Sequence, residues 1–211
     1  MATPKPQVKS TFATPLCIHF LPVANEVNVD LRALITQRFS AAGGVSQEQG
    51  WSSQNDLESW GGNAGQTLFR VLRELADSMT ATRAGGRISL DWTIAASGHV
   101  RQRGEYRALA ARPGAFWSGV YFVDDGYNKS DDPALGGHVE LADPRGALPA
   151  MVAPQLAFRI PGGGSAGQTE SIRPSSGMIV LHPSWQPRGA RRYDGDGQRV
   201  TIEFDLLPPA S

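Results

Sequence analysis

The stretch that decides the fold runs from Ile172 to Leu206 and reads IRPSSGMIVLHPSWQPRGARRYDGDGQRVTIEFDL. It contains an apolar strand at 179–182, a Pro-Ser-Trp turn, a basic segment, a tight turn rich in Gly and Asp, and an alternating strand at 199–206. Side chains that alternate along the last stretch are typical of a β-strand, whose successive side chains point to opposite faces. The stretch therefore predicts a β-rich C-terminal part.

Short strands are also predicted upstream of this stretch. They are expected at 11–21, 88–94, 117–123, 137–142 and 156–160. Glycine and proline, 24 and 15 residues respectively, are spread along the chain, and this favours many strands joined by turns over a helical bundle.

Two helices are predicted in the N-terminal half. The first covers 31–41 and can be capped by Asn28 to Asp30. The second covers 66–80, where apolar residues recur at helical spacing and predict a core-facing stripe. Residues 42–63 are expected to form a long ordered loop, and 162–164 a glycine-rich one. Helices followed by about eight strands indicate a helix-backed sandwich or barrel.

The length of 211 residues suits one domain with a sizeable core. Residues 1–10 are polar and are expected to be a flexible terminus, so that 11–211 form a single domain. Lysine plus arginine and aspartate plus glutamate are both 20, and zero net charge argues against a general nucleic-acid binder. The single cysteine, Cys17, excludes an intrachain disulfide. With no apolar run of about 18 residues and no secretory signal, a cytoplasmic protein that does not bind membranes is expected.

Six phrases occur in an order that resembles one enzyme family. They are FATPL at 12–16, GWSSQNDL at 50–57, WSGVYFV at 117–123, GGHVELADPRG at 136–146, SSGMIVLHPSW at 175–185 and GDGQRVTIEF at 195–204. The chain resembles the bacterial 2-oxoglutarate/Fe(II) oxygenases over about residues 11–207. The resemblance implies a mainly β fold, a cupin-like jelly roll or double-stranded β-helix, with N-terminal helices packed on one face.

The resemblance also implies where iron would be bound. The family carries a His-x-His phrase before the W-S-G-V-Y strand and another histidine after the Pro-Ser-Trp turn. This sequence has Ala110, Arg112 and Arg188 at those positions. Alanine has no donor atom, and arginine stays protonated with no lone pair to offer a metal. We therefore expect no metal site and no cofactor, although Fe(II) and 2-oxoglutarate are those of the family.

The position that holds 2-oxoglutarate is better preserved. In the family an arginine on the last strand, with a hydroxyl residue two positions later, holds the far carboxylate, and Arg199 and Thr201 match this pattern. Tyr121 matches the tyrosine that would complete the pocket. The bidentate fork of arginine suits a carboxylate. The alternative is that Arg199 is a buried structural arginine or part of a surface salt bridge.

Some residues point to a different chemistry. Glu203 lies on the same strand face as Thr201, and in an enclosed cavity burial would raise its pKa and suit it to acid/base work. The alternative is that Glu203 pairs with Arg112 or Arg188 as a structural tie. His138, His182 and Tyr121 are further candidate catalytic residues, although a strand histidine is more often simply hydrogen-bonded in place.

Basic residues form two clusters, which would attract an anionic substrate if both lie at the barrel mouth. The alternative is a solvated surface. The clusters consist of Arg101, Arg103, Arg107 and Arg112, and of Arg188, Arg191 and Arg192.

Three functions follow as hypotheses. The first is a metal-independent, oxygenase-like protein that binds a small anionic or polar organic molecule in the barrel. Its catalysis, if any, would be a non-oxidative cyclisation, isomerisation or elimination in a biosynthetic pathway. The second is a non-catalytic partner or ligand-binding pseudoenzyme of an active oxygenase, with a homo-oligomer or a paralogue as its assembly. The third is a true Fe(II)/2-oxoglutarate dioxygenase with relocated ligands.

Overall fold

The computed structural model describes residues 13–44, 50–147, 151–156 and 167–210. The predicted flexible terminus at 1–10, most of the predicted strand at 156–160 and the predicted loop at 162–164 lie outside the described residues. None of the described helices is long and apolar enough to cross a membrane.

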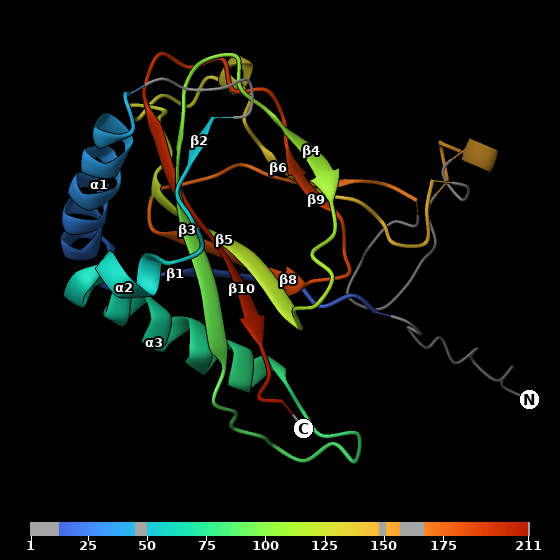
Figure 1. The fold of residues 1–211 in the computed structure, drawn as a ribbon. Coiled ribbons are helices and arrows are strands. Elements are labelled where there is room, and N and C mark those ends of the chain that lie inside the picture. Colours follow the sequence, from blue (N-terminus) through green and yellow to red (C-terminus); the bar gives the residue numbers. More distant parts are fainter. Residues whose placement is uncertain (1–12, 45–49, 148–150, 157–166, 211) are drawn as a thin grey trace, which may run out of the picture.

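The described strands form two antiparallel sheets that face each other (Figure 1). The larger sheet has six strands in the order β1 (Cys17–Phe20), β8 (Met178–Pro183), β5 (Trp117–Asp124), β10 (Arg199–Leu207), β3 (Thr93–Arg101) and β2 (Trp51–Ser52). The smaller sheet has four strands in the order β4 (Arg107–Ala110), β9 (Arg188–Ala190), β6 (Val139–Leu141) and β7 (Glu170–Ile172).

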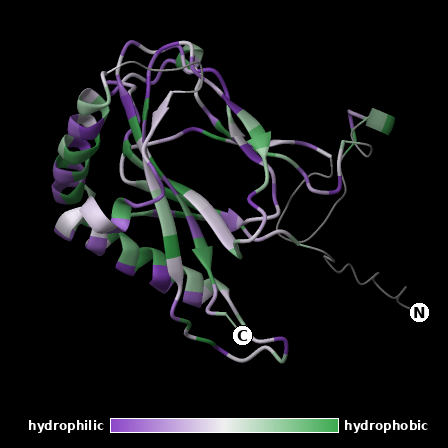
Figure 2. Ribbon diagram, in the orientation of Figure 1, coloured by the Kyte–Doolittle hydropathy of each residue, from purple (hydrophilic) through white to green (hydrophobic). Residues whose placement is uncertain are grey.

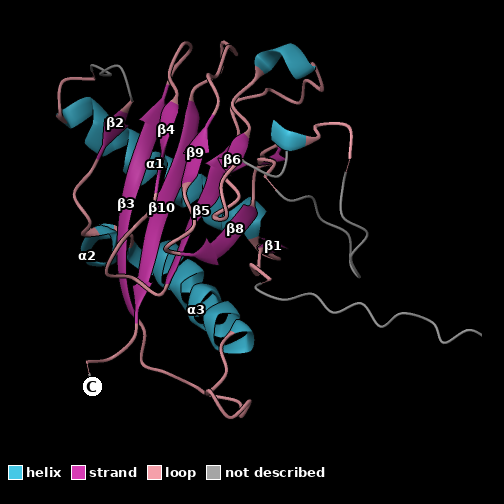
Figure 3. Cartoon of the chain, turned by 90° about the vertical axis from the view of Figure 1, so that its right-hand side faces the viewer, coloured by secondary structure: helices cyan, strands magenta, loops and turns pink. Residues whose placement is uncertain are grey.

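Helices cover the outer face of the larger sheet. They are α1 (Ala24–Ala41), α2 (Leu57–Trp60) and α3 (Gly62–Met79), and a short 3-10 helix, η1, spans Pro133–Leu135. In the side view the helices lie behind the larger sheet, with the smaller sheet in front (Figure 3). Hydrophobic and hydrophilic residues alternate in bands along α1 and α3 (Figure 2). The helices therefore bury one apolar side and leave the other in solvent.

The main hydrophobic core lies between these helices and the sheet. Every fourth residue of α1, from Val27 through Leu31 and Ile35 to Phe39, is buried there. The matching residues of β10 are Val200, Ile202, Phe204 and Leu206, which alternate with the residues that face the other sheet.

A second, smaller core lies between the two sheets. It contains Val120 and Phe122 of β5 and Val180 of β8, which meet Val139 and Leu141 of β6. Both faces of the larger sheet are therefore buried, the outer one by helices and the inner one by the smaller sheet.

Two glycines allow close approach on the helix-facing side. A Cβ atom at Gly119 would lie 2.4 Å from the ring of Phe204 and 2.4 Å from the carbonyl oxygen of Val180. At Gly98 a Cβ atom would lie 2.9 Å from a side-chain carbon of Ile35 on α1. Larger residues at these positions would push the neighbouring strand or helix away.

Four strand predictions are confirmed: those at 117–123, 137–142, 179–182 and 199–206 correspond to β5, β6, β8 and β10. The predicted strand at 88–94 is largely wrong, since β3 begins only at Thr93. The carboxylate of Asp77 accepts hydrogen bonds from the backbone N–H of Leu90, from Ser89 and from Trp92. This segment is therefore attached to α3 before the strand begins.

The N-terminal half differs from the prediction in two places. Helix α1 begins at Ala24, so Asn28 to Asp30 lie inside it rather than capping it; Val27 adds a buried turn that the sequence pattern did not reveal. Residues 42–63 are not one loop, because the described part contains β2, α2 and the start of α3. Leu57 is completely buried there, and Trp51 packs edge-on against Phe39 at 5.7 Å between ring centroids.

Candidate functional site

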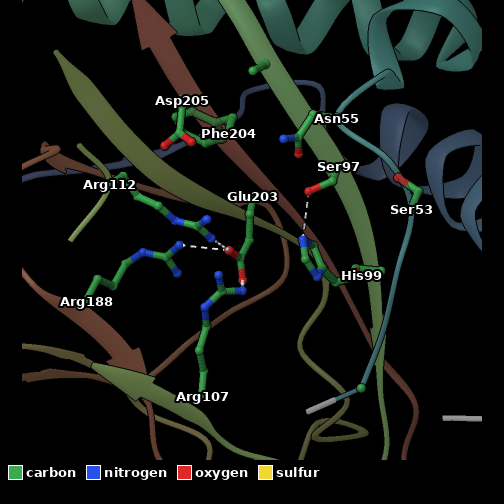
Figure 4. A pocket seen from close by; sticks show the side chains of 13 residues that line it. Ser53, Asn55, Ser97, His99, Arg107, Arg112, Arg188, Glu203, Phe204 and Asp205 are labelled. Atoms are coloured by element: carbon green, nitrogen blue, oxygen red, sulfur yellow. Dashed lines mark hydrogen bonds and ion pairs between the residues drawn. The ribbon is translucent and has the colours of Figure 1, made fainter. Parts of the chain in front are cut away.

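A polar cavity of about 560 Å³ lies between the larger sheet and the β4–β9 pair (Figure 4). Strands β3 and β10 supply one wall, the segment from Gly50 to Asn55 supplies a second, and arginines reach in from β4, β9 and the residues after β4. The lining includes Ser52, Ser53, Asn55, Ser97, His99, Arg107, Arg112, Arg188, Glu203 and Asp205.

Four arginines converge on Glu203, the buried glutamate of β10. Its Oε1 accepts a hydrogen bond from Arg101 Nη2 at 2.8 Å and another from Arg107. Its Oε2 accepts from Arg112 Nη2 at 2.9 Å and from Arg188 Nη2 at 3.1 Å. The expectation that Glu203 pairs with Arg112 or Arg188 is confirmed, and the pairing extends to both residues and to two further arginines.

The acid/base role expected for Glu203 does not suit this arrangement. Burial raises the pKa of the Glu203 carboxyl, but the positive charges of Arg188, Arg101 and Arg107 together hold this pKa well below its usual range. Both oxygens already accept two hydrogen bonds each from arginines. The expected rise in pKa is therefore wrong, because the neighbouring guanidinium groups outweigh desolvation. A carboxylate with a lowered pKa, whose oxygens already accept four hydrogen bonds, is a poor proton donor or acceptor.

The three positions at which the resemblance places iron ligands lie close together in space. Ala110 of β4 is the register partner of Arg188 on β9, and Arg112 and Arg188 both donate to Oε2 of Glu203. Their donor chemistry does not suit Fe(II), since guanidinium groups have no lone pair and bring positive charge. In the described part of the chain, no group of three or more His, Cys, Asp or Glu side chains is arranged to hold a metal ion.

Arg199 lies at the start of β10 and is tied to backbone. Its Nε donates to the carbonyl of Asp125 at 2.8 Å and its Nη1 to the carbonyl of Gly137 at 2.6 Å. Its guanidinium carbon lies 4.3 Å from the ring centroid of Tyr193 and 4.9 Å from that of Tyr127. These contacts match the alternative of a buried structural arginine. Its Nη2 is buried without a partner among the described residues.

Tyr121 lies on the other side of the larger sheet from Arg199. Its hydroxyl donates to the Oδ1 of Asn28 on α1, and its ring belongs to the core beneath the helices. The neighbours of Tyr121 along β5, Val120 and Phe122, face the smaller sheet instead. Tyr121 therefore does not complete a pocket with Arg199 and Thr201, since alternation places it on the opposite face. Thr201 is buried on the inner face, opposite His99.

Two predicted catalytic histidines lie away from the cavity lining. His182 of β8 is buried, and its Nδ1 lies 2.9 Å from the carbonyl oxygen of Pro183. Burial, helped by the charge of Arg188, lowers the pKa of His182 to about 4. His138 precedes β6, is half-buried, and has a pKa lowered by burial and by nearby arginines. The structure therefore does not bring these histidines together with Glu203 around one cavity.

The cavity contains a histidine that was not among the predicted site residues. His99 of β3 lines it, with its Nε2 2.9 Å from the Oγ of Ser97. Burial lowers the pKa of His99 to about 4, so its imidazole is neutral at pH 7. The signal was present in the sequence, because Ser97, His99 and Arg101 alternate with small or apolar residues.

Comparisons with known proteins agree on one fold. The sequence pattern of the family described as "Putative 2OG-Fe(II) oxygenase" matches residues 98–205. AviO1 from Streptomyces viridochromogenes Tue57 is 17% identical, with a TM-score of 0.61 over 94% of this chain and 91% of that chain. None of the curated proteins matches the chain.

Two further solved structures are similar. A prolyl hydroxylase from Trichoplax adhaerens, in complex with a hypoxia-inducible-factor peptide, is 13% identical with a TM-score of 0.60 over 92% of this chain and 83% of that one. HygX from Streptomyces hygroscopicus, with nickel and 2-oxoglutarate bound, is 11% identical with a TM-score of 0.57 over 93% and 83%. At these identities the likeness concerns the fold alone.

The predicted fold class is confirmed: two facing antiparallel sheets form a double-stranded β-helix with N-terminal helices on one face. The family pattern runs from the second half of β3 through most of β10 and includes every described arginine that contacts Glu203. The chain belongs to the 2OG-Fe(II) oxygenase family.

Proposed function

We propose that this chain is a metal-independent member of its family that binds a small organic anion in the arginine-lined cavity. The observation that carries the proposal is the imbalance of charge around Glu203, where four guanidinium groups share one carboxylate. Glu105, near Arg101, and Asp205, which lines the same cavity, bring the negative charges on this side to three against four arginines. The cluster remains positive, and a bound anion would compensate it.

Two of the arginines are accessible to such an anion. The side chains of Arg107 and Arg112 are 20% and 37% exposed, whereas those of Arg101 and Arg188 are buried. Each of the two accessible side chains makes one hydrogen bond to Glu203 within the described part of the chain. A guanidinium carries five N–H donors, so several remain for a ligand in the cavity. Their planar arrangement suits a carboxylate or phosphate group.

An uncompensated positive charge in a partly enclosed site is costly. Removing a charged group from water costs several kcal/mol unless an opposite charge replaces the lost hydration. Glu203 offsets part of this cost, and by holding all four arginines it also fixes their geometry. We therefore assign Glu203 a positioning role, and assign the binding of the anion to Arg107 and Arg112.

Any chemistry on the bound molecule would be non-oxidative. Ala110, Arg112 and Arg188 offer no ligand for iron, and this supports a reaction that does not use it. Prearranged arginines stabilise negative charge that develops on a substrate during isomerisation or elimination, because they need no reorganisation as the charge forms. His99 lines the same cavity as a neutral imidazole.

Binding of simple anions tests the proposal. Pentanoate and inorganic phosphate are titrated at constant ionic strength, and binding is followed by chemical-shift changes and by the shift in Tm. We expect specific, saturable binding by the parent and about 10- to 100-fold weaker binding by Arg112→Gln, since a charge-assisted hydrogen bond contributes about 1.5–3 kcal/mol. Arg70→Gln, on the exposed side of α3, is the matched control and is expected to bind as the parent does. Absence of saturable anion binding by the parent would refute the proposal.

Metal analysis tests the independence from iron. After anaerobic reconstitution with Fe(II) and removal of excess metal, we expect far less than one iron per chain. Stoichiometric iron, retained in Arg112→Gln as well, would instead support an oxygenase with relocated ligands.

A further inference from the structure

The cavity that contains the arginines also contains a carboxylate with a different environment. Asp205 lies two residues after Glu203 on the same face of β10 and lines the same cavity. It is half-buried, and Ser118 of β5 donates a hydrogen bond to its Oδ1. In the described part of the chain no Lys, Arg or His forms an ion pair with Asp205.

The two carboxylates therefore have opposite relations to their neighbours. Glu203 is saturated by arginines, whereas Asp205 accepts one hydrogen bond from a neutral hydroxyl. An ionised carboxylate has about four acceptor sites, so Asp205 retains several for a partner in the cavity. A negative group lining a partly enclosed space attracts a cation or a strong hydrogen-bond donor.

The cavity has a carboxylate, Asp205, toward one end and arginines around Glu203, and its lining is polar. In Figure 4, Asp205 and Asn55 lie toward one end, Arg107 lies on the other side of Glu203, and Arg112 and Arg188 approach Glu203 from beside it. Ser53 and Ser97 also line this cavity. Two residues of strand span about 7 Å, which sets the scale of the separation between Glu203 and Asp205.

We infer that the cavity takes a small organic zwitterion, with its acidic group on Arg107 and Arg112 and its ammonium group at Asp205 and Asn55. This inference rests on the proposed anion binding and adds the class of ligand. A linear dianion of the same length would place its second negative charge against Asp205. The cavity therefore discriminates against dicarboxylates and favours amino acids whose two charges are several bonds apart.

Three compounds of matched chain length test the inference. 5-Aminopentanoate carries both charges, pentanoate lacks the ammonium group, and adipate replaces that group with a second carboxylate. Affinities are measured at pH 7.5 and constant ionic strength by chemical-shift titration of the full chain. We expect 5-aminopentanoate to bind about tenfold more tightly than pentanoate, and adipate to bind more weakly than pentanoate.

Substitution of Asp205 identifies the group that discriminates. Asp205→Asn keeps the size of the side chain and its bond to Ser118, and we expect it to remove the preference for 5-aminopentanoate over pentanoate. Arg112→Gln is expected to weaken all three compounds alike. The heteronuclear spectrum of each variant verifies that the fold is intact.

The outcomes separate this inference from the proposal on which it depends. Equal binding of pentanoate and 5-aminopentanoate by the parent, or an unchanged preference in Asp205→Asn, overturns the zwitterion and leaves the anion site in place. Failure of all three compounds and of phosphate overturns both. Tight binding of adipate would show that Asp205 does not face the ligand.

Discussion

The space between the two sheets has an apolar end and an ionic end, and they are built from the same strands. The inner face of β5 changes from Phe122 and Val120 to Ser118, and that of β8 changes from Val180 to His182. At the apolar end these residues meet Leu141 and its neighbours on β6. At the ionic end the corresponding space is occupied by the arginines around Glu203 and by the cavity.

The two ends contribute differently to the protein. Apolar side chains stabilise the fold without specific partners, roughly in proportion to the area that they bury. A buried ionic cluster is stable only as a complete set, because each member compensates the desolvation of the others. Well-packed hydrophobic residues would serve stability at least as well as this cluster. The ionic cluster is therefore weak evidence of a stabilising role, and it is consistent with the proposed binding of a charged ligand.

The largest effect is expected from removing the central charge of the ionic end. Glu203→Gln leaves four arginines without their shared carboxylate and should lower the free energy of unfolding by about 3–5 kcal/mol. Urea unfolding at pH 7 measures the change. Asp196→Asn is the control, because Asp196 is 86% exposed in its ion pair with Arg103. A Glu203→Gln variant as stable as the parent would show that the arginines are compensated by solvent or by other groups.

The apolar end should respond through lost packing alone. Leu141→Ala removes a completely buried side chain from the inner core and should cost about 3 kcal/mol in the same urea experiment. The loss should be the same at low and high salt, because the substitution removes no charge. Leu156→Ala, at a site that is 68% exposed, is the matched control. A strong salt dependence of the Leu141 variant would mean that the two ends are coupled.

Two buried histidines, His182 and His99, should make the protein less stable in acid. The pKa of His182 falls from 6.5 to about 4 on folding, and that of His99 behaves likewise. The unfolded chain therefore binds more protons between these values, and stability falls as the pH drops from about 6.5 toward 4. From pH 7.5 to 5 each histidine accounts for about 2 kcal/mol.

Denaturant midpoints measured across this pH range test the prediction, and His182→Gln should remove roughly half of the histidine-dependent change. Glu203 affects stability only at lower pH. Because its pKa is lowered in the folded protein, the stability that its charge provides is present above its ordinary pKa of 4.5 and is lost as the pH falls below that value. Identical pH profiles for the parent and His182→Gln would contradict the buried, neutral state of this histidine.

The smallest effect is expected from an ion pair outside both ends. Glu74 and Arg70 pair on α3 at 3.4 Å with side chains 63% and 67% exposed. Glu74→Gln should lower the free energy of unfolding by only about 0.3 kcal/mol, because water screens the exposed charges. A loss comparable to that of Glu203→Gln would remove the distinction between buried and exposed charge on which the comparison depends.

Much of the fold was predictable, because long alternating or apolar stretches carry their own signal. The strands β5, β8 and β10 were found in this way, whereas β4, β7 and β9 are only three or four residues long and contain charged residues or glycine. Strands of that length form because neighbouring strands supply their partners. Their positions therefore depend on tertiary contacts that no local pattern records.

The candidate site was predictable in part. Alternation predicted that Glu203 lies on the same face of β10 as Thr201. The resemblance predicted that Arg112 and Arg188 lie near it, and both donate hydrogen bonds to Glu203. The face of Tyr121 was not predictable, because both faces of β5 are buried and the sequence there has no polar side to fix the register. Asn55 and Asp205 line the same cavity from segments far apart in the chain, and no periodicity links them.

Gly119 has a consequence for how such proteins are classified. The glycine of the W-S-G-V phrase is required by contact with Phe204 and the backbone of β8, beneath the helices. This phrase, one of the six that carry the resemblance, thus records a packing constraint on the helix-covered face of the sheet. The resemblance places the iron ligands at Ala110, Arg112 and Arg188, and the two arginines bind Glu203 on the other face. Detection and activity can diverge independently over evolutionary time. A match to such a phrase predicts the fold of a protein. Its reaction depends on the residues that face the cavity on the other side of the same strands.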